Sequence, residues 1–304
     1  MLEPAGKIFS SALGAGFGYG GHTAWLRGFP DVARERMRVA IASATELKSP
    51  FEQAYTQWLA AKLQLFLRNF ETSKDCRGRV SCSVRGARIS ALGRRSYILP
   101  WPRGSRRRAP DSAMPRINLG FRGMEESRAL GGMTIFLGWL AVAQALAGKT
   151  AEALDTVERA LQANPAELYV LPEALRIRGE LRLRRQQTEL AEADFRDSLA
   201  VARKQGAKSW ELRSAMSLAH MLTKRRDRRA ARDLLAPVYG WYTEGFDTAD
   251  LKNARALLEE LGYVQERKAI ERRLYCPGTR DVRLCTQALA GTAIPFGVTG
   301  ESPA

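Results

Sequence analysis

The chain has 304 residues, of which 45% are hydrophobic and 26% are charged. This composition predicts a globular protein with a sizeable core, and it excludes a collagen, a disulfide-rich miniprotein and a wholly disordered chain. The 48 Lys and Arg outnumber the 32 Asp and Glu, which gives a net charge of +16. Such an excess favours an anionic partner only where the charge covers a folded surface.

Residues 1–70 predict a pair of antiparallel helices followed by a single helix. Small and apolar residues recur three and four apart in Phe17–Ala24 and again in Ala33–Ala40, with Gly28 between them. This spacing is typical of one buried stripe on each helix. A further helix is expected from Pro50 to Arg68, and the pattern of its partner helix does not follow.

Residues 71–116 lose the helical period and hold twelve Lys or Arg against three Asp or Glu, more than half of the charge excess. One interpretation is an irregular loop, and another is a stretch read in a shifted frame between two compensating insertions or deletions. A third is an element that binds nucleic acid or an anionic surface by counterion release. Only Tyr97 and Trp101 could stack on bases, so nucleic acid is not the partner we expect.

Residues 117–262 predict about three helix pairs. In each pair an apolar residue of the first helix precedes an alanine of the second helix by sixteen positions. The three such pairs of residues are Leu137 and Ala153, Leu175 and Ala191, and Ala215 and Ala231. The units recur at intervals of 38 and then 40 residues. Because one pair cannot bury its apolar face alone, the pairs are expected to stack into a superhelix with a concave groove. Residues 263–304 are expected to form a helical extension and a flexible tail.

The array resembles the tetratricopeptide repeat (TPR), with two departures. The usual aromatic residue of the first helix is replaced by Gln144, Arg182 and Leu222, and the period exceeds the common 34 residues. The resemblance implies an all-α fold: a TPR-like superhelix of antiparallel helix pairs, interrupted by the irregular basic segment at 71–116.

A more specific resemblance rests on Ala200–Arg213 and Asp233–Lys252. These stretches look like the C-terminal array of multidomain bacterial proteins that carry a class III adenylate/guanylate cyclase domain and an AAA-type ATPase. The likeness runs from about Ser127 to Leu261 and, more weakly, over Gly18–Phe70. It implies a non-catalytic, cytoplasmic scaffold, either the regulatory region of such a signalling protein or a fragment of one. The alternative, a cyclase by family label, would lack its catalytic domain in this chain, so we expect no enzyme.

The sequence predicts no cofactor and no metal site. Gly16–Gly21 satisfies the dinucleotide fingerprint, but no strand precedes it, and Gly148–Thr150 lacks the earlier glycine of a phosphate-binding loop. We interpret the first as part of a helix and the second as a turn between helices. The spacings of the four cysteines fit no zinc motif. The most apolar run, Met133–Gly148, is too short to span a membrane.

By analogy with TPR arrays, the first helix of each pair lines the groove. The candidate binding residues are Arg176, Glu180, Arg213, Met216, Ser217 and His220. Their mixed charges favour a protein or peptide partner that is held through charge-assisted hydrogen bonds. Reversing the charges of Arg176 and Arg213 is expected to abolish binding and to leave the helices intact.

Overall fold

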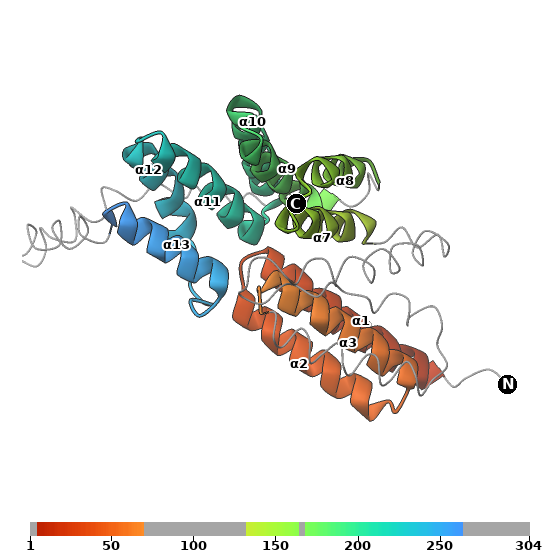
Figure 1. Cartoon of the computed structure of the whole chain (residues 1–304). Coiled ribbons are helices and arrows are strands. Elements are labelled where there is room, and N and C mark those ends of the chain that lie inside the picture. Colours follow the sequence, from red (N-terminus) through yellow and green to blue (C-terminus); the bar gives the residue numbers. More distant parts are fainter. Residues whose placement is uncertain (1–4, 70–131, 164–167, 264–304) are drawn as a thin grey trace, which may run out of the picture. The chain divides into compact units, whose positions relative to one another are not determined.

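The computed structural model describes residues 5–69, 132–163 and 168–263 (Figure 1). The chain divides into two units, residues 1–261 and 262–304, and all that follows concerns the first. The described residues are helical and contain no strand. The helices are α1 (Ala5–Leu26), α2 (Pro30–Glu46), α3 (Pro50–Phe66), α7 (Met133–Leu146), α8 (Thr150–Ala163), the short 3-10 helix η1 (Leu168–Val170), α9 (Leu171–Arg184), α10 (Thr188–Gln205), α11 (Lys208–Lys224), α12 (Arg228–Gly240) and α13 (Ala249–Glu260).

Consecutive helices pack as pairs, and the pairs stack on one another. The close pairs are α1 with α2, α7 with α8, α9 with α10, and α11 with α12. Between pairs, α7 contacts α9, α9 contacts α11, and α11 contacts α13, so the first helices of successive pairs lie side by side (Figure 1). This arrangement confirms the expected all-α, TPR-like superhelix of antiparallel helix pairs.

Small residues allow the two helices of a pair to approach closely. Gly179 of α9 is buried and faces α10, where a Cβ atom at position 179 would lie 2.6 Å from the ring of Phe195. In the first pair, a Cβ at Gly21 would lie 3.1 Å from the carbonyl oxygen of Ala33. The alanines predicted at these crossings, such as Ala191, have no exposed surface. The spacing of sixteen residues therefore marks helix crossings, as the sequence indicated.

The turn inside each pair has three residues, and its middle residue adopts the left-handed conformation. The φ angle is +85° at Gly148, +62° at Gln186 and +66° at Arg226. In each case the next backbone N–H donates to a carbonyl five residues earlier, as Lys149 does to Gln144 at 2.9 Å. This bond satisfies a carbonyl at the end of the first helix that would otherwise lack a partner.

Both sequence motifs that resemble nucleotide-binding loops are parts of this helical framework. Gly16–Gly21 lies inside α1, where backbone amides are committed to helix hydrogen bonds. Gly148 occupies the left-handed turn position, and Thr150 opens α8. The structure confirms both interpretations.

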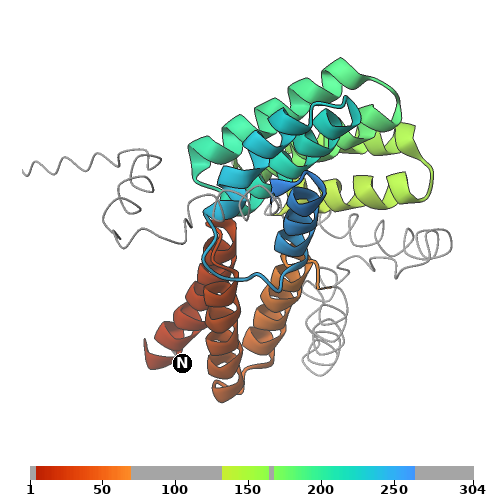
Figure 2. The same cartoon turned by 90° about the vertical axis from the view of Figure 1, so that its left-hand side faces the viewer.

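The N-terminal helices α1, α2 and α3 pack against one another, and α1 also contacts α11 (Figure 2). The contact is aromatic: the rings of Trp25 and Phe66 are stacked at 4.6 Å between centroids, and both meet the edge of Trp210 on α11. The repeat pattern does not predict this contact, because Trp210 lies more than 140 positions from both Trp25 and Phe66. The basic segment 71–116, the tail from residue 264 and the four cysteines lie outside the described residues.

Candidate functional site

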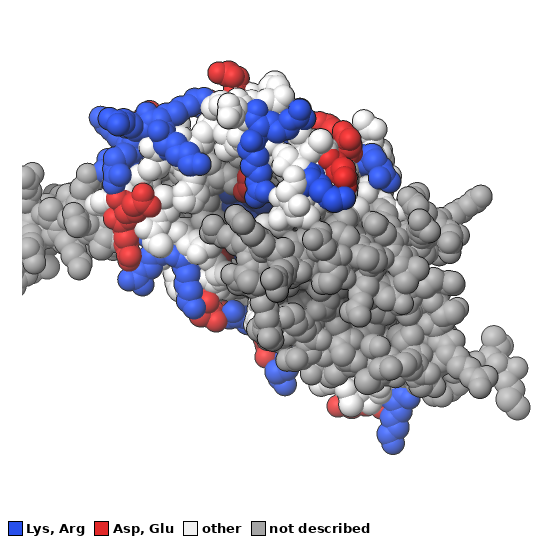
Figure 3. Space-filling model, viewed as in Figure 1, with Lys and Arg blue, Asp and Glu red and all other residues white. Residues whose placement is uncertain are grey.

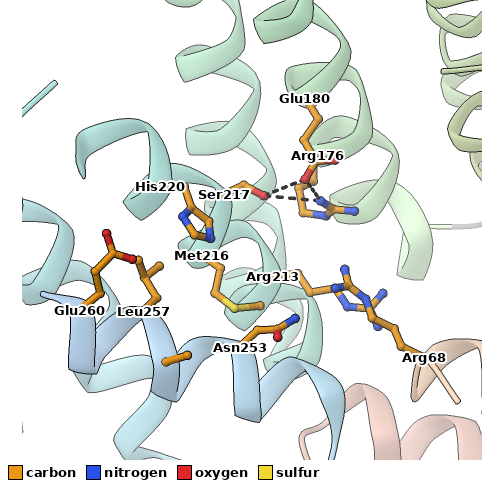
Figure 4. A pocket seen from close by; sticks show the side chains of 11 residues that line it. Arg68, Arg176, Glu180, Arg213, Met216, Ser217, His220, Asn253, Leu257 and Glu260 are labelled. Carbon is orange, nitrogen blue, oxygen red and sulfur yellow. Dashed lines mark hydrogen bonds and ion pairs between the residues drawn. The ribbon is translucent and has the colours of Figure 1, made fainter. Parts of the chain in front are cut away.

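A pocket of about 370 Å³ lies between α9, α11 and α13 (Figure 4). All six side chains that the sequence analysis placed in the groove line it: Arg176, Glu180, Arg213, Met216, Ser217 and His220. Five further residues complete the lining, and these are Arg68, Asn253, Ala256, Leu257 and Glu260. The pocket is thus formed by α9 and α11, each the first helix of its pair, by α13, and by the turn that follows α3.

The repeat explains why these side chains meet. Arg176, Arg213 and Asp250 follow one another at intervals of 37 residues, and they lie on the neighbouring helices α9, α11 and α13. This interval is three residues shorter than the repeat of 40 from Leu175 to Ala215. Glu180 and Ser217 are also 37 apart, and the hydroxyl of Ser217 donates to Glu180 at 3.2 Å. The stacking of α9 and α11 therefore brings residues 37 apart into contact.

Arg213 forms the centre of that floor and is only 5% exposed. Its Nε donates to Asp250 at 2.7 Å and its Nη1 to Glu173 at 3.4 Å. Its Nη2 donates to the carbonyl oxygen of Phe66 at 2.5 Å. The guanidinium also lies over the rings of Trp210 and Trp25, at 4.9 and 5.3 Å from their centroids. Arg213 thus joins the array to the N-terminal helices.

Arg176, which is 6% exposed, is held by carboxylates on its own helix. Its Nε and Nη2 donate to both oxygens of Glu173 at 2.7 and 2.8 Å, and its Nη1 contacts Glu180 and, at 3.4 Å, Ser217. Burial alone would raise the pKa of Glu173, but the charges and hydrogen bonds of Arg176, with the charge of Arg213, lower it to about 2. The floor is therefore ionised at any physiological pH.

Arg68 enters the pocket from the turn after α3, where it adopts a left-handed φ of +56°. Its Nε lies 3.1 Å from the Oδ1 of Asp250, and its side chain is 31% exposed. Asp250 raises the pKa of Arg68, but burial and the positive charges of Arg213 and Arg176 outweigh this effect, so the pKa lies below its usual value. The fold therefore holds this third arginine in an unfavourable electrostatic environment.

The opposite end of the pocket carries a carboxylate and an imidazole. Glu260 and His220 lie on the side away from Arg68, whereas Glu180 lies beside Arg176 (Figure 4). Glu260, His220 and Asn253 are exposed, and 44% of the Glu180 side chain is exposed. The two ends are named after their side chains: the cationic end at Arg68 and the acidic end at Glu260.

The structure brings the six predicted residues together but changes the role expected of some. Arg176, Arg213 and Met216 are buried and form the floor, while Glu180, Ser217 and His220 reach the open side. A glutamate at position 176 or 213 would lie against Glu173 or Asp250, so reversing both charges would disrupt the fold. From the burial of both arginines we now expect this variant to be destabilised as well as unable to bind.

Sequence reasoning missed Arg68 and the side chains of α13. The interval of 37 residues, extended once more from Met216 and His220, leads to Asn253 and Leu257 and could have found the α13 wall. The spacing of Glu173, Arg176 and Glu180 is a second overlooked signal, because residues three and four apart on a helix can pair. The repeat pattern does not point to Arg68, because this residue lies in the turn after α3 and outside the array of helix pairs.

A second cavity of about 310 Å³ lies between α1, α3, η1 and α11. It is lined mainly by aromatic rings, including those of Tyr19, Trp25 and Trp210. His22 is buried there, and its Nε2 lies 2.9 Å from the carbonyl oxygen of Leu59. Burial and the charge of Lys62 lower the pKa of His22 to about 3, against the opposing effect of the bond to Leu59.

Other chemistry can be assessed only over the described ranges. There, no group of three or more His, Cys, Asp and Glu is placed to hold a metal. Within the same ranges, no helix combines the length and apolar character needed to cross a membrane.

Lys and Arg are prominent over α12 and the turn before it (Figure 3), where residues 224–229 are exposed. Part of this charge is paired, as in Arg225 with Glu192 at 2.5 Å.

Comparison with known proteins adds information on the fold. No family model and no curated protein matches the chain. Among solved structures, 31 chains match. One is the crystal structure of NprR in complex with its cognate peptide NprX, with a TM-score of 0.58 and 15% sequence identity. The match covers 97% of this chain and 80% of that chain. At this identity the likeness shows a shared TPR-like architecture.

Proposed function

We propose that this protein is a non-catalytic scaffold that binds a peptide or a segment of a protein in the pocket between α9, α11 and α13. The observation that carries the proposal is that all six groove residues inferred from the repeat line one pocket. The likeness to NprR, which was crystallised with its cognate peptide, supports a peptide as the ligand.

The polar groups of the pocket suit a peptide. The side chains of Ser217, Asn253 and His220 can each bond to backbone N–H or C=O groups. Leu257 and Met216 supply apolar surface beside them. A floor that is fixed by ion pairs before the ligand arrives loses little conformational freedom on binding, which favours affinity.

Filling the pocket should abolish binding. Ala256 lines the pocket from the exposed side of α13, so Ala256→Trp is expected to occupy the space without disturbing the core. The probe is an array of capped octapeptides of random central sequence, and affinities are measured by fluorescence anisotropy. We expect the wild-type chain to bind a subset and Ala256→Trp to lose at least tenfold in affinity for it.

The matched control is Ala200→Trp, which adds the same side chain at an exposed position of α10 that does not line the pocket. This variant should bind as the wild type does. Equal losses in both variants, or unchanged binding by Ala256→Trp, would exclude the pocket as the peptide site.

We further propose that the scaffold belongs to the regulatory region of a bacterial, cytoplasmic signalling protein of the cyclase/ATPase type. The support is the resemblance of Ala200–Arg213 and Asp233–Lys252 to the C-terminal array of such proteins. The purified chain is expected to convert neither ATP nor GTP to a cyclic nucleotide when assayed by chromatography. Turnover would favour the cyclase alternative.

Binding to nucleic acid or to an anionic surface through residues 71–116 is the remaining alternative from the sequence. Its test is the salt dependence of binding to a 20-base oligonucleotide and to anionic vesicles, with and without that segment. A steep dependence that disappears on deletion would support it.

A further inference from the structure

The charged groups of the pocket are segregated along α13. Asp250 lies in the first turn of this helix, where it contacts Arg68, and Glu260 is its last residue. Ten residues of helix correspond to about 15 Å. In Figure 4 Arg68 and Glu260 accordingly lie at opposite sides of the pocket.

At the cationic end, Arg68 retains capacity to bind an anion. Within the described part of the chain its ion pair is with Asp250, at 3.1 Å through Nε, and that carboxylate already accepts a shorter bond of 2.7 Å from Arg213. Among the described residues, no carboxylate pairs with the two terminal nitrogens of the Arg68 guanidinium. These nitrogens belong to the planar fork that binds carboxylates in a bidentate manner.

The surroundings of Arg68 partly oppose its charge. Asp250 raises the pKa of Arg68, but burial and the charges of Arg213 and Arg176 lower it below its usual value. The left-handed backbone conformation of Arg68 adds strain for a residue that is not glycine. Arg176 and Arg213 already pair with carboxylates, so a bound anion would compensate the positive charge of Arg68.

At the acidic end, Glu260 has the opposite preference. The backbone carbonyl of Glu260 accepts a hydrogen bond from Arg228, whereas its carboxylate forms no ion pair within the described residues. Its side chain is exposed. The Glu260 carboxylate can therefore accept bonds from a cationic group of a ligand. Glu180, in contrast, is paired with Arg176.

We propose that the pocket recognises a dipolar peptide segment, with an Asp or Glu side chain at Arg68 and a Lys or Arg side chain at Glu260. This inference rests on the proposed peptide-binding function. An extended chain advances about 3.3 Å per residue, so a span of about 15 Å places the two charged residues of the ligand about four or five positions apart.

The probe is a set of capped octapeptides, Ac-Gly-X-Ser-Ala-Ala-X-Gly-Gly-NH2, and a second set with one more Ala between the variable positions. The variable positions carry Asp and Lys, Lys and Asp, Asp and Asp, Lys and Lys, or Ala and Ala. We expect one order of the mixed pair to bind roughly tenfold more tightly than the Ala peptide.

Two variants with matched controls assign the two ends. Arg68→Gln should remove the preference for Asp and leave that for Lys, whereas Arg226→Gln should change neither. Arg226 occupies the same left-handed turn position, with φ +66°, and does not line the pocket. Glutamine is compatible with that conformation, as Gln186 shows.

Glu260→Gln should remove the preference for Lys. The matched control is Glu259→Gln, which should keep this preference, because the carboxylate of Glu259 pairs with Arg255 on the same helix.

The possible outcomes separate this inference from the proposed function. If the octapeptides bind, and if Ala256→Trp abolishes binding while the mixed-charge peptides show no advantage, the pocket binds peptides but the dipolar preference is wrong. If neither these sets nor the random array binds, the peptide-binding function itself fails. Loss of binding in Arg226→Gln equal to that in Arg68→Gln would assign the effect to net charge and overturn the site at Arg68.

Discussion

The pocket floor and the aromatic cavity bury polar groups in opposite ways, although both contact Phe66. On the floor, the Phe66 carbonyl oxygen accepts a bond from Arg213, and the buried charges are compensated by carboxylates. In the cavity, the Phe66 ring packs on Trp25 and His22, the histidine is kept neutral, and the buried ammonium of Lys62 lies over aromatic rings. The difference shows two ways to bury polar groups: the floor pairs its arginines with carboxylates, whereas the cavity neutralises a histidine and places a cation on aromatic faces.

The largest effect is expected from breaking the floor at Glu173. Glu173→Gln preserves the shape of the side chain but removes the negative charge that Arg176 and Arg213 share. Breaking one partner of a buried pair leaves an uncompensated charge, so unfolding free energy should fall by about 3–5 kcal/mol. Urea denaturation followed by circular dichroism measures this change.

Glu192→Gln is the control for that measurement, because Glu192 pairs with Arg196 and Arg225 at the surface. Its effect should stay below about 1 kcal/mol. Similar decreases in unfolding free energy for Glu173→Gln and Glu192→Gln would mean that the buried ion pairs of the floor contribute no more to stability than surface ion pairs do.

The cavity predicts a different signature, a dependence of stability on pH. Because the pKa of His22 is about 3 in the folded chain and about 6.5 when unfolded, the unfolded state binds the proton first. Stability is therefore complete above about pH 6.5 and falls as the pH decreases toward 3. Between pH 7 and pH 5 the loss through His22 should be about 2 kcal/mol. Glu173 contributes little in this interval: its pKa is about 2 in the folded chain and about 4.3 when unfolded, so its stabilisation is lost mainly below pH 5.

Urea melts at pH 7, 6 and 5 test this expectation. His22→Gln retains a donor toward Leu59 but cannot take up a proton, so its stability should be lower at pH 7 and nearly constant down to pH 5. An equally steep decrease in His22→Gln would assign the pH dependence to other groups.

The smallest effect is expected for Arg68, which lies at the edge of the charged floor. Asp250 keeps Arg213 as its partner when Arg68 is replaced, and the repulsion from the neighbouring arginines is removed. Arg68→Gln should therefore change the unfolding free energy by no more than about 0.5 kcal/mol, in the same urea assay. A loss of 2 kcal/mol or more would make Arg68 a structural residue and weaken its role in binding.

The sequence predicted the parts of the molecule that are fixed by neighbours along the chain. The small residues at helix crossings, such as Gly179 and Ala191, recur with a local spacing that can be recognised directly. The repeat also placed Arg213 and His220 at one pocket. The packing of α1–α3 on α11 could not be predicted, because contacts such as that between Phe66 and Arg213 join residues 147 positions apart and leave no periodic signal.

The order in which the floor is assembled has a consequence for the protein during its synthesis. Each helix pair of the array contacts helices close to it in sequence, so the pairs can form soon after they leave the ribosome. The ionic floor instead combines residues from α9 and α11 with Asp250 of α13 and the carbonyl oxygen of Phe66. A nascent chain therefore contains a nearly complete array well before Arg213 gains its last carboxylate. The pocket itself is complete only when α13 has emerged.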